Sequence, residues 1–140
     1  MDALQQAKVY LEQEGYTCVA CREQTCYGSR ARGVRPLLQW LEDGLELKGF
    51  CVADRVVGRA TAFLYCLLGV EEVYTPIIST PALGVLKEHG IRVAFDRQVP
   101  YIRNRTGDGR CPMETATLCC TTPQQALAAI RTALAALQQS

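Results

Sequence analysis

The sequence predicts a single α/β domain over residues 1–140, with a five-stranded mixed sheet in a three-layer α/β/α arrangement. Short apolar segments alternate with amphipathic segments of helical length. Such strand–helix–strand alternation implies parallel strands joined by right-handed crossovers. An early hairpin adds an antiparallel strand, which makes the sheet mixed. The length and the hydrophobic content of 49% suffice for one buried core.

The first half of the chain supplies three of the five strands. Pro36 suits the first turn of a helix and Gly44 lies just beyond its end. Asp54 follows a buried strand and is a suitable N-cap for the next helix. We predict, in order, a helix (residues 2–14), two hairpin strands (16–22 and 25–28), a helix (34–42), a strand (49–53) and a helix (55–68).

The second half supplies the remaining two strands and the helices that cover them. Thr80 and Pro81 open a helix that closes at His89 and Gly90. A loop rich in proline and arginine follows the last strand. We predict a strand (residues 72–77), a helix (80–89), a strand (91–95), a short helix from Pro112 onward and a C-terminal helix (123–138). In the last helix, an apolar stripe predicts a surface that docks on the core, formed by Leu127, Ile130, Leu134 and Leu137.

Composition excludes several classes of function. The net charge of +1 argues against a non-specific nucleic-acid binder, which needs a strongly basic face. The longest apolar run, residues 60–70, is too short to span a bilayer. Because the N-terminus shows no signal peptide, we expect a cytoplasmic protein that binds neither nucleic acid nor membrane.

Eight cysteines in a chain without an export signal predict reduced thiols and no disulfides. Cys18 and Cys21 are three residues apart, and such residues point to opposite faces of a strand. A metal site formed by Cys18, Cys21 and Cys26 is therefore not expected, and we predict no metal and no cofactor.

The order of the elements matches that of the cytidine deaminase-like fold. Four segments also resemble a prokaryotic family, domain of unknown function 1893, namely residues 29–38 (SRARGVRPLL), 53–60 (ADRVVGRA), 99–105 (VPYIRNR) and 111–114 (CPME). The likeness extends from residue 16 to about residue 120. It implies a deaminase-like fold without a defined activity. Lysine is usual in that family at the positions of Arg55 and Arg59, so chemistry that needs a lysine amine would be lost here, whereas a requirement for charge would be met.

The residues of a zinc deaminase are missing. Such an enzyme places H-x-E at the start of its second helix and P-C-x-x-C at the start of its third. The corresponding segments, residues 32–36 and 54–59, contain neither histidine nor cysteine nor glutamate. Zinc-activated hydroxide needs about three protein ligands, so we predict no deamination by that route.

The candidate ligand site lies where the carboxyl ends of the parallel strands meet the helix N-termini. Ligands of open α/β sheets bind at this edge, and helix N-termini favour anions. The chain holds twelve arginines against three lysines, and guanidinium groups suit phosphate or carboxylate. The alternative is a solvated arginine-rich face that reflects a GC-rich genome. The predicted ligand-binding residues are Arg32, Arg35, Asp54, Arg55, Gly58, Arg59, Ser79, Asn104 and Arg105.

Cys111 and Glu114 form a second candidate feature. Pro112 predicts that Cys111 stands at or beside a helix N-cap, where the helix dipole favours the nucleophilic thiolate. Glu114 fits a capping box in the same helix, or it faces the thiol. The two residues are candidate catalytic groups, and the alternative is a well-capped helix start with a buried cysteine.

Three functions are compatible with these patterns. The first is a domain that binds a small anionic ligand such as a nucleotide or phosphate. The second is a cysteine-dependent enzyme or redox sensor that uses Cys111. The third is a non-catalytic interaction module, since the outer amphipathic helices would suit a homo-oligomer. A pocket formed by Arg55, Arg59 and Asn104 near Cys111 would favour the first two functions, and a filled, flat edge would favour the third.

Overall fold

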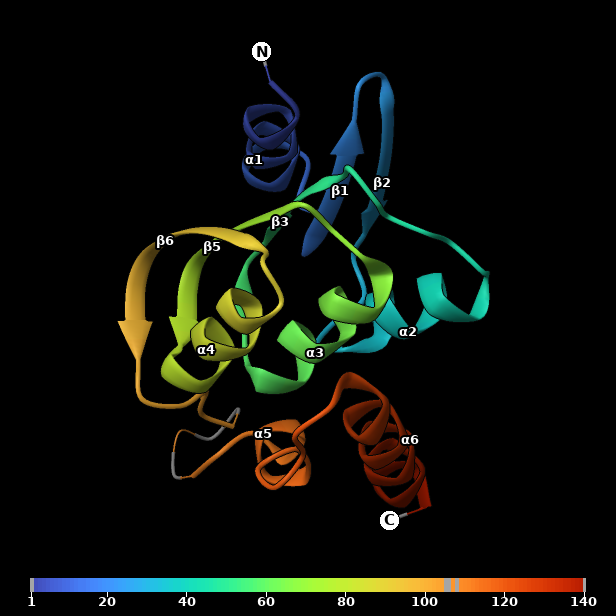
Figure 1. Ribbon diagram of the computed structural model, residues 1–140, viewed down its shortest axis with the longest axis vertical. Coiled ribbons are helices and arrows are strands. Elements are labelled where there is room, and N and C mark those ends of the chain that lie inside the picture. The colour runs from blue at the N-terminus through green and yellow to red at the C-terminus, as the bar shows by residue number, and fades with distance from the viewer. Residues whose placement is uncertain (1, 105–106, 108, 140) are drawn as a thin grey trace.

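A computed structural model describes residues 2–104, 107 and 109–139. These residues form a mixed α/β structure, shown in Figure 1. The helices are α1 (Ala3–Gln13), α2 (Arg35–Glu42), α3 (Arg59–Leu68), α4 (Thr80–Glu88), α5 (Pro112–Ala116) and α6 (Pro123–Gln139). The strands are β1 (Cys18–Arg22), β2 (Thr25–Ser29), β3 (Cys51–Asp54), β4 (Val56–Val57), β5 (Glu72–Ser79) and β6 (Arg92–Val99).

The described strands form one open mixed sheet. It has six strands, so the predicted number of five is wrong. β1 pairs antiparallel with β2 and β3, whereas β5 pairs parallel with β3, β4 and β6. The additional strand is the two-residue β4, which lies beyond β3 along the same side of β5.

A proline explains why β3 and β4 are separate strands. The register pairs Ala53 with Tyr74 and Val56 with Ile77, so both strands keep one alignment along β5. The intervening Pro76 has no N–H to donate to a neighbouring strand. The pairing of β5 with β6 skips Pro76 as well, passing from Thr75 to Ile77. The short β4 is therefore the part of an interrupted strand that lies beyond the proline.

The start of α3 also differs from the prediction. Its N-cap is Gly58 rather than Asp54, because β4 lies between Asp54 and the helix. Asp54 instead ends β3, where its side chain is 8% exposed. A residue expected to cap a helix is thus a buried acid at the carboxyl end of a central strand.

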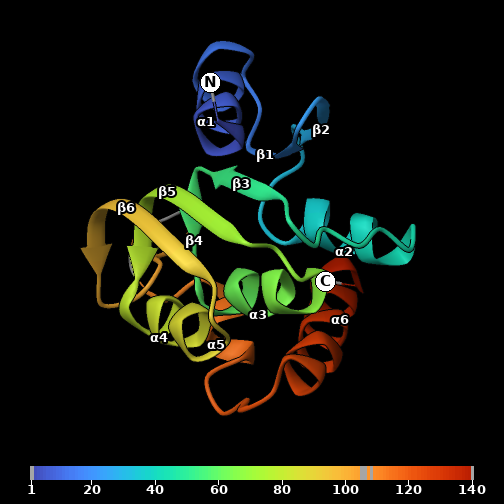
Figure 2. The same cartoon turned by 45° about the horizontal axis from the view of Figure 1, so that its top comes forward.

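Alternating strand residues pack into two apolar clusters. Ala20 and Val52 belong to the larger cluster with α2, α3, α4 and α6, whereas Val19 and Ala53 pack with α1. Figure 2 shows α1 across the sheet from α3 and α4. Successive residues of β1 and β3 therefore pack against different helices.

The last helix packs on the core through the predicted stripe. Ile130 is fully buried, and Leu127 and Leu134 pack partly buried against the larger cluster. Leu137, at the end of the stripe, is 50% exposed. The helix α6 contacts both α3 and α5.

The hairpin contains a disulfide between Cys21 and Cys26, which corrects the expectation of reduced thiols. The two residues face each other in the register of β1 and β2, with 4.2 Å between their Cα atoms. The turn therefore places the thiols within bonding reach whatever the compartment. Cys18 lies in the larger core cluster and Cys21 in the cluster beneath α1, so these two residues point to opposite faces as predicted.

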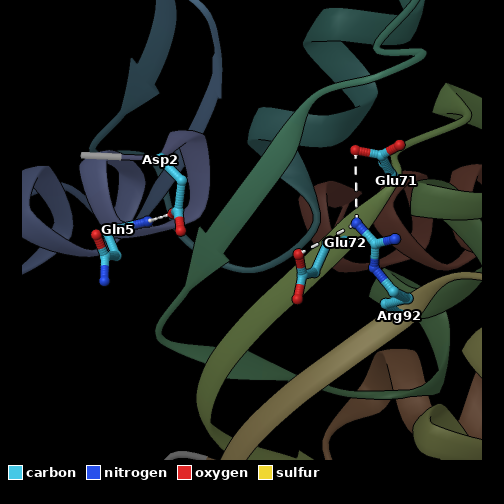
Figure 3. A network of polar contacts seen from close by, with 5 residues as sticks. All are labelled: Asp2, Gln5, Glu71, Glu72 and Arg92. Atoms are coloured by element: carbon cyan, nitrogen blue, oxygen red, sulfur yellow. Dashed lines mark hydrogen bonds and ion pairs between the residues drawn. The ribbon is translucent and has the colours of Figure 1, made fainter.

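Polar contacts at the surface lie at the start of α1 and at the amino ends of β5 and β6. In Figure 3, the Asp2 carboxylate accepts a hydrogen bond of 2.8 Å from the Gln5 N–H and so caps α1. Arg92 lies 3.6 Å from Glu71 and 3.5 Å from Glu72. Because the Arg92 side chain is 66% exposed, the ion pairs contribute little, on the order of 0–1 kcal/mol. Within the described part of the chain, no helix combines the length and apolar character needed to cross a membrane.

Candidate functional site

A cavity of about 340 Å³ opens where β1 begins, β3 ends, and α2 and α3 start. The wall is completed by residues 102–103 and by α5, which contacts α3 (Figure 1). This is the edge at which the sequence predicts a ligand site. We call this space the main cavity.

Asp54 lines the main cavity and forms a buried polar pair with Tyr65, which does not itself line it. The Tyr65 hydroxyl, fully buried in α3, donates a hydrogen bond of 2.6 Å to Oδ2 of Asp54. The Cys18 thiol lies 3.0 Å from the same hydroxyl. The other carboxylate oxygen, Oδ1, has a long contact of 3.5 Å with the Val56 N–H, and the Arg55 N–H and the Cys18 thiol also interact with the carboxylate. One oxygen of Asp54 is thus held by Tyr65, while the other is weakly bonded beside the cavity.

Burial changes the protonation of this pair. Desolvation raises the pKa of Asp54 from 3.8 to about 7, although hydrogen bonds from Tyr65, Val56 and Arg55 offset part of the effect. Burial, reinforced by the charge of Asp54, also raises the pKa of Tyr65 and of Cys18 well above their ordinary values. Asp54 therefore titrates near neutral pH, while the tyrosine and the thiol stay protonated.

Glu114 brings a second buried carboxylate to the main cavity. Its side chain is 3% exposed, and its Oε1 accepts a hydrogen bond of 3.0 Å from the backbone N–H of Arg59. Glu114 thus caps α3 and not its own helix, which corrects the capping-box prediction. The approach requires Gly58, since an added Cβ would lie 2.5 Å from that oxygen. Gly58, one of the predicted residues, makes room for the carboxylate.

Two exposed arginines stand at the rim. Arg32 precedes α2, and Arg103 lies in the segment before α5; both line the main cavity. Neither guanidinium has a hydrogen bond or ion pair with another residue among those the structure describes. Arg103 is absent from the predicted site, although the sequence places it beside Asn104 and Arg105. These two cations are available to a group that enters from solvent.

Two of the predicted arginines, Arg55 and Arg59, donate hydrogen bonds to backbone carbonyls of the protein itself. Arg55 donates to the Tyr16 carbonyl at 2.8 Å and to the Leu11 carbonyl at 3.0 Å. Arg59 does not line the main cavity. It donates to the carbonyls of Thr117 and Cys120 at 3.0 and 2.6 Å. Both guanidinium groups therefore tie backbone segments together.

Cys111 connects the main cavity with a neighbouring hollow of about 530 Å³. It is the N-cap of α5 and is half-buried. Arg35 and Asn104 line the second hollow with it, as do Leu134 and Leu137 of α6. The structure therefore gathers the predicted residues Arg35, Asn104 and Cys111 beside the main cavity.

The remaining predicted residues lie elsewhere. Ser79 is fully buried and caps α4 by accepting a hydrogen bond of 3.2 Å from Ala82. Arg105 lies outside the described residues. Sequence reasoning also missed Cys18 and Tyr65, because nothing local distinguishes them from ordinary core residues. Within the described residues, no three histidine, cysteine or acidic side chains are grouped so that they could hold a metal ion.

Comparisons with known proteins agree on one family. The model of the TM1506 family, a domain of unknown function (DUF1893), matches residues 6–134. The chain is also similar to the crystal structure of a DUF1893 family protein, TM1506, from Thermotoga maritima. The TM-score is 0.87 at 23% sequence identity, over 93% of this chain and 88% of that one. No curated protein matches the chain.

Proposed function

The chain belongs to the DUF1893 family, and we propose that it binds a small anionic metabolite or nucleotide in the main cavity. The observation that carries this proposal is the pair of exposed arginines at the rim. Arg32 and Arg103 line one cavity, and neither is paired with another described residue. A guanidinium group presents a planar fork of N–H donors that matches a phosphate or carboxylate.

The helix starts beside the main cavity add little to the two arginines. At α2, the Arg35 N–H donates to the Arg32 carbonyl at 3.4 Å, and Pro36 has no N–H. At α3, the Glu114 carboxylate already accepts from the Arg59 N–H. An incoming anion is therefore expected at the rim guanidinium groups of Arg32 and Arg103 rather than at a helix start.

The size and position of the cavity favour a small molecule. Small-molecule sites range from about 300 to 1,000 Å³, and the main cavity of 340 Å³ lies at the lower end. We assign the chain a three-layer, cytidine deaminase-like fold. In that assignment, the cavity lies beside the starts of α2 and α3, the two helix starts at which a working deaminase holds its base.

A cysteine-dependent reaction at Cys111 is the second candidate function. Cys111 lines the cavity beside both rim arginines, so a bound anion would lie near the thiol. Of the residues predicted to form a pocket near Cys111, Arg55 lines the main cavity and Asn104 the neighbouring hollow, whereas Arg59 lines neither. A hollowed edge of this kind favours a ligand site over a flat interaction module.

A thermal-shift screen tests the proposal. Inorganic phosphate and adenosine and cytidine monophosphates should stabilise the protein, by about 2.7 kcal/mol at a hundredfold excess over the dissociation constant. Arg32→Ala and Arg103→Ala should reduce the stabilisation, and Arg131→Ala on the exposed face of α6 is the matched control. Equal losses for all three variants would indicate general attraction to positive charge and contradict a site.

A further inference from the structure

The main cavity pairs two cations at its rim with two acids on its wall. Arg32 and Arg103 are exposed, whereas Asp54 and Glu114 are 8% and 3% exposed. A cavity built only for an anion gains nothing from buried carboxyl groups, which repel negative charge. The wall and the rim therefore suit different ends of one molecule.

Neither acid has a cationic partner among the described residues. The ion pairs of the described chain involve only Arg92 with Glu71 and Glu72. Arg55, the next residue after Asp54, directs its guanidinium to the carbonyls of Leu11 and Tyr16. A buried carboxylate without a counter-ion costs several kcal/mol of desolvation. The protein thus retains two acids beside a cavity without offsetting their charge.

Each acid is nevertheless fixed in position. Tyr65 holds Oδ2 of Asp54, and the Arg59 N–H holds Oε1 of Glu114. The hydrogen bonds from described residues leave Oε2 of Glu114 without a donor, and Oδ1 of Asp54 has a long contact of 3.5 Å with Val56. Carboxylate oxygens are acceptors, so the wall offers acceptor positions to a donor that enters the cavity.

We propose that the ligand is a compact zwitterion, whose anionic group meets Arg32 and Arg103 and whose amine or other N–H-bearing group meets Asp54 and Glu114. This inference rests on the proposed anion site and adds the chemistry of the opposite end. The raised pKa of Asp54, caused by burial without a cation, is consistent with an acid whose partner is supplied by the ligand. Aminoalkyl phosphates, amino acids and nucleotides with an exocyclic amine carry this pair of groups.

Matched probes separate the two ends. Ethyl phosphate and propyl phosphate carry only the anion, whereas 2-aminoethyl phosphate and 3-aminopropyl phosphate add an amine at two spacer lengths. Calorimetric titration of the intact chain should show at least one amino probe binding about tenfold or more tightly than its alkyl counterpart, as expected for a charge-assisted hydrogen bond.

Variants of Asp54 and Glu114 then test whether these acids cause the preference for the amino probes. Asp54→Asn should lower the affinity for the amino probe to about that of the alkyl probe. Glu114→Gln, whose amide oxygen still accepts from the Arg59 N–H, gives a second reading that does not depend on the folding of Asp54→Asn. Arg32→Ala should weaken both members of each pair, and Arg131→Ala should weaken neither.

The outcomes distinguish the two proposals. Equal affinity for amino and alkyl probes, or a preference that survives both acid variants, would overturn the zwitterion while leaving the anion site intact. Failure of every probe to bind would overturn the anion site, and the zwitterion with it.

Discussion

Oε1 of Glu114 accepts a hydrogen bond of 3.0 Å from the backbone N–H of Arg59. A carboxylate from α5 therefore caps α3, a helix whose own N-cap, Gly58, has no side chain to do so. This contact fixes α5, and with it Cys111, against the start of α3. The same buried contact closes one side of the main cavity.

Removal of this cap should destabilise the fold. Glu114→Ala leaves the N–H of Arg59 unsatisfied and should lower the free energy of unfolding by about 1–3 kcal/mol. Glu114→Gln should cost less, because its amide oxygen can still accept the hydrogen bond. Urea denaturation measures both variants. Equal losses would show that the carboxylate charge, rather than the hydrogen bond, stabilises the start of α3.

The approach of Glu114 also makes Gly58 sensitive to substitution. A Cβ at position 58 would lie 2.5 Å from Oε1 of Glu114 and 3.1 Å from Cγ1 of Ile102. Gly58→Ala should therefore destabilise the protein by about 1–3 kcal/mol. Gly84→Ala is the control, since that helical glycine has open space around it and should gain about 0.5–1 kcal/mol. Similar effects in thermal or urea unfolding would contradict the close approach.

Asp54 should impose a pH dependence on stability. The unfolded carboxyl ionises near its ordinary pKa of 3.8, whereas burial raises the native pKa to about 7. The native state therefore binds more protons between these values, and stability should fall as the pH rises through this window. The loss should reach up to about 4 kcal/mol above pH 7.

Asp54→Asn isolates this contribution. The amide oxygen can accept from Tyr65 without carrying charge, so the variant should gain stability relative to the natural sequence as the pH rises from about 4 to 7. Urea denaturation across this range gives the difference between the two proteins. A difference that does not vary with pH would mean that Asp54 ionises as an ordinary exposed acid does.

Arg59 should matter for folding more than for binding. Its guanidinium donates to the carbonyls of Thr117 and Cys120, which join α5 to α6. Arg59→Ala should cost about 1–3 kcal/mol of stability, because it leaves these carbonyls unpaired. Its affinity for inorganic phosphate should remain closer to that of Arg131→Ala than to that of Arg32→Ala. A loss of phosphate affinity as large as that of Arg32→Ala would contradict this prediction and show that Arg59 takes part in anion binding.

The sequence predicted the main elements because their signals are local. Ser79 and Cys111 occupy the N-cap positions of α4 and α5, within a residue of the predicted positions. The sixth strand was missed because β4 has two residues and lies beyond an interruption opposite Pro76. That error also placed the predicted N-cap of α3 at Asp54 instead of Gly58.

The site was predicted less completely, since side-chain direction depends on tertiary contacts. Position in the chain placed Arg55 and Arg59 near the site, but each guanidinium turns to distant backbone carbonyls. Tyr65 resembles a core residue of α3 and reveals its role only through the bond to Asp54. The disulfide between Cys21 and Cys26 follows from the register of the hairpin, whereas the prediction of reduced thiols was based on the cellular compartment.

Protection of Cys111 from alkylation tests the occupied cavity most directly. Cys111 lines the main cavity, whereas Cys119 is exposed away from it and serves as the control. Burial raises the pKa of Cys66 to about 12, so that thiol should react slowly. Labelling by iodoacetamide is measured by mass spectrometry without ligand and with saturating phosphate or nucleoside monophosphate. The account predicts that bound anion slows labelling of Cys111 and not of Cys119, and that Arg32→Ala abolishes this protection. Identical rates at Cys111 with and without every anion would contradict an anion site in the main cavity.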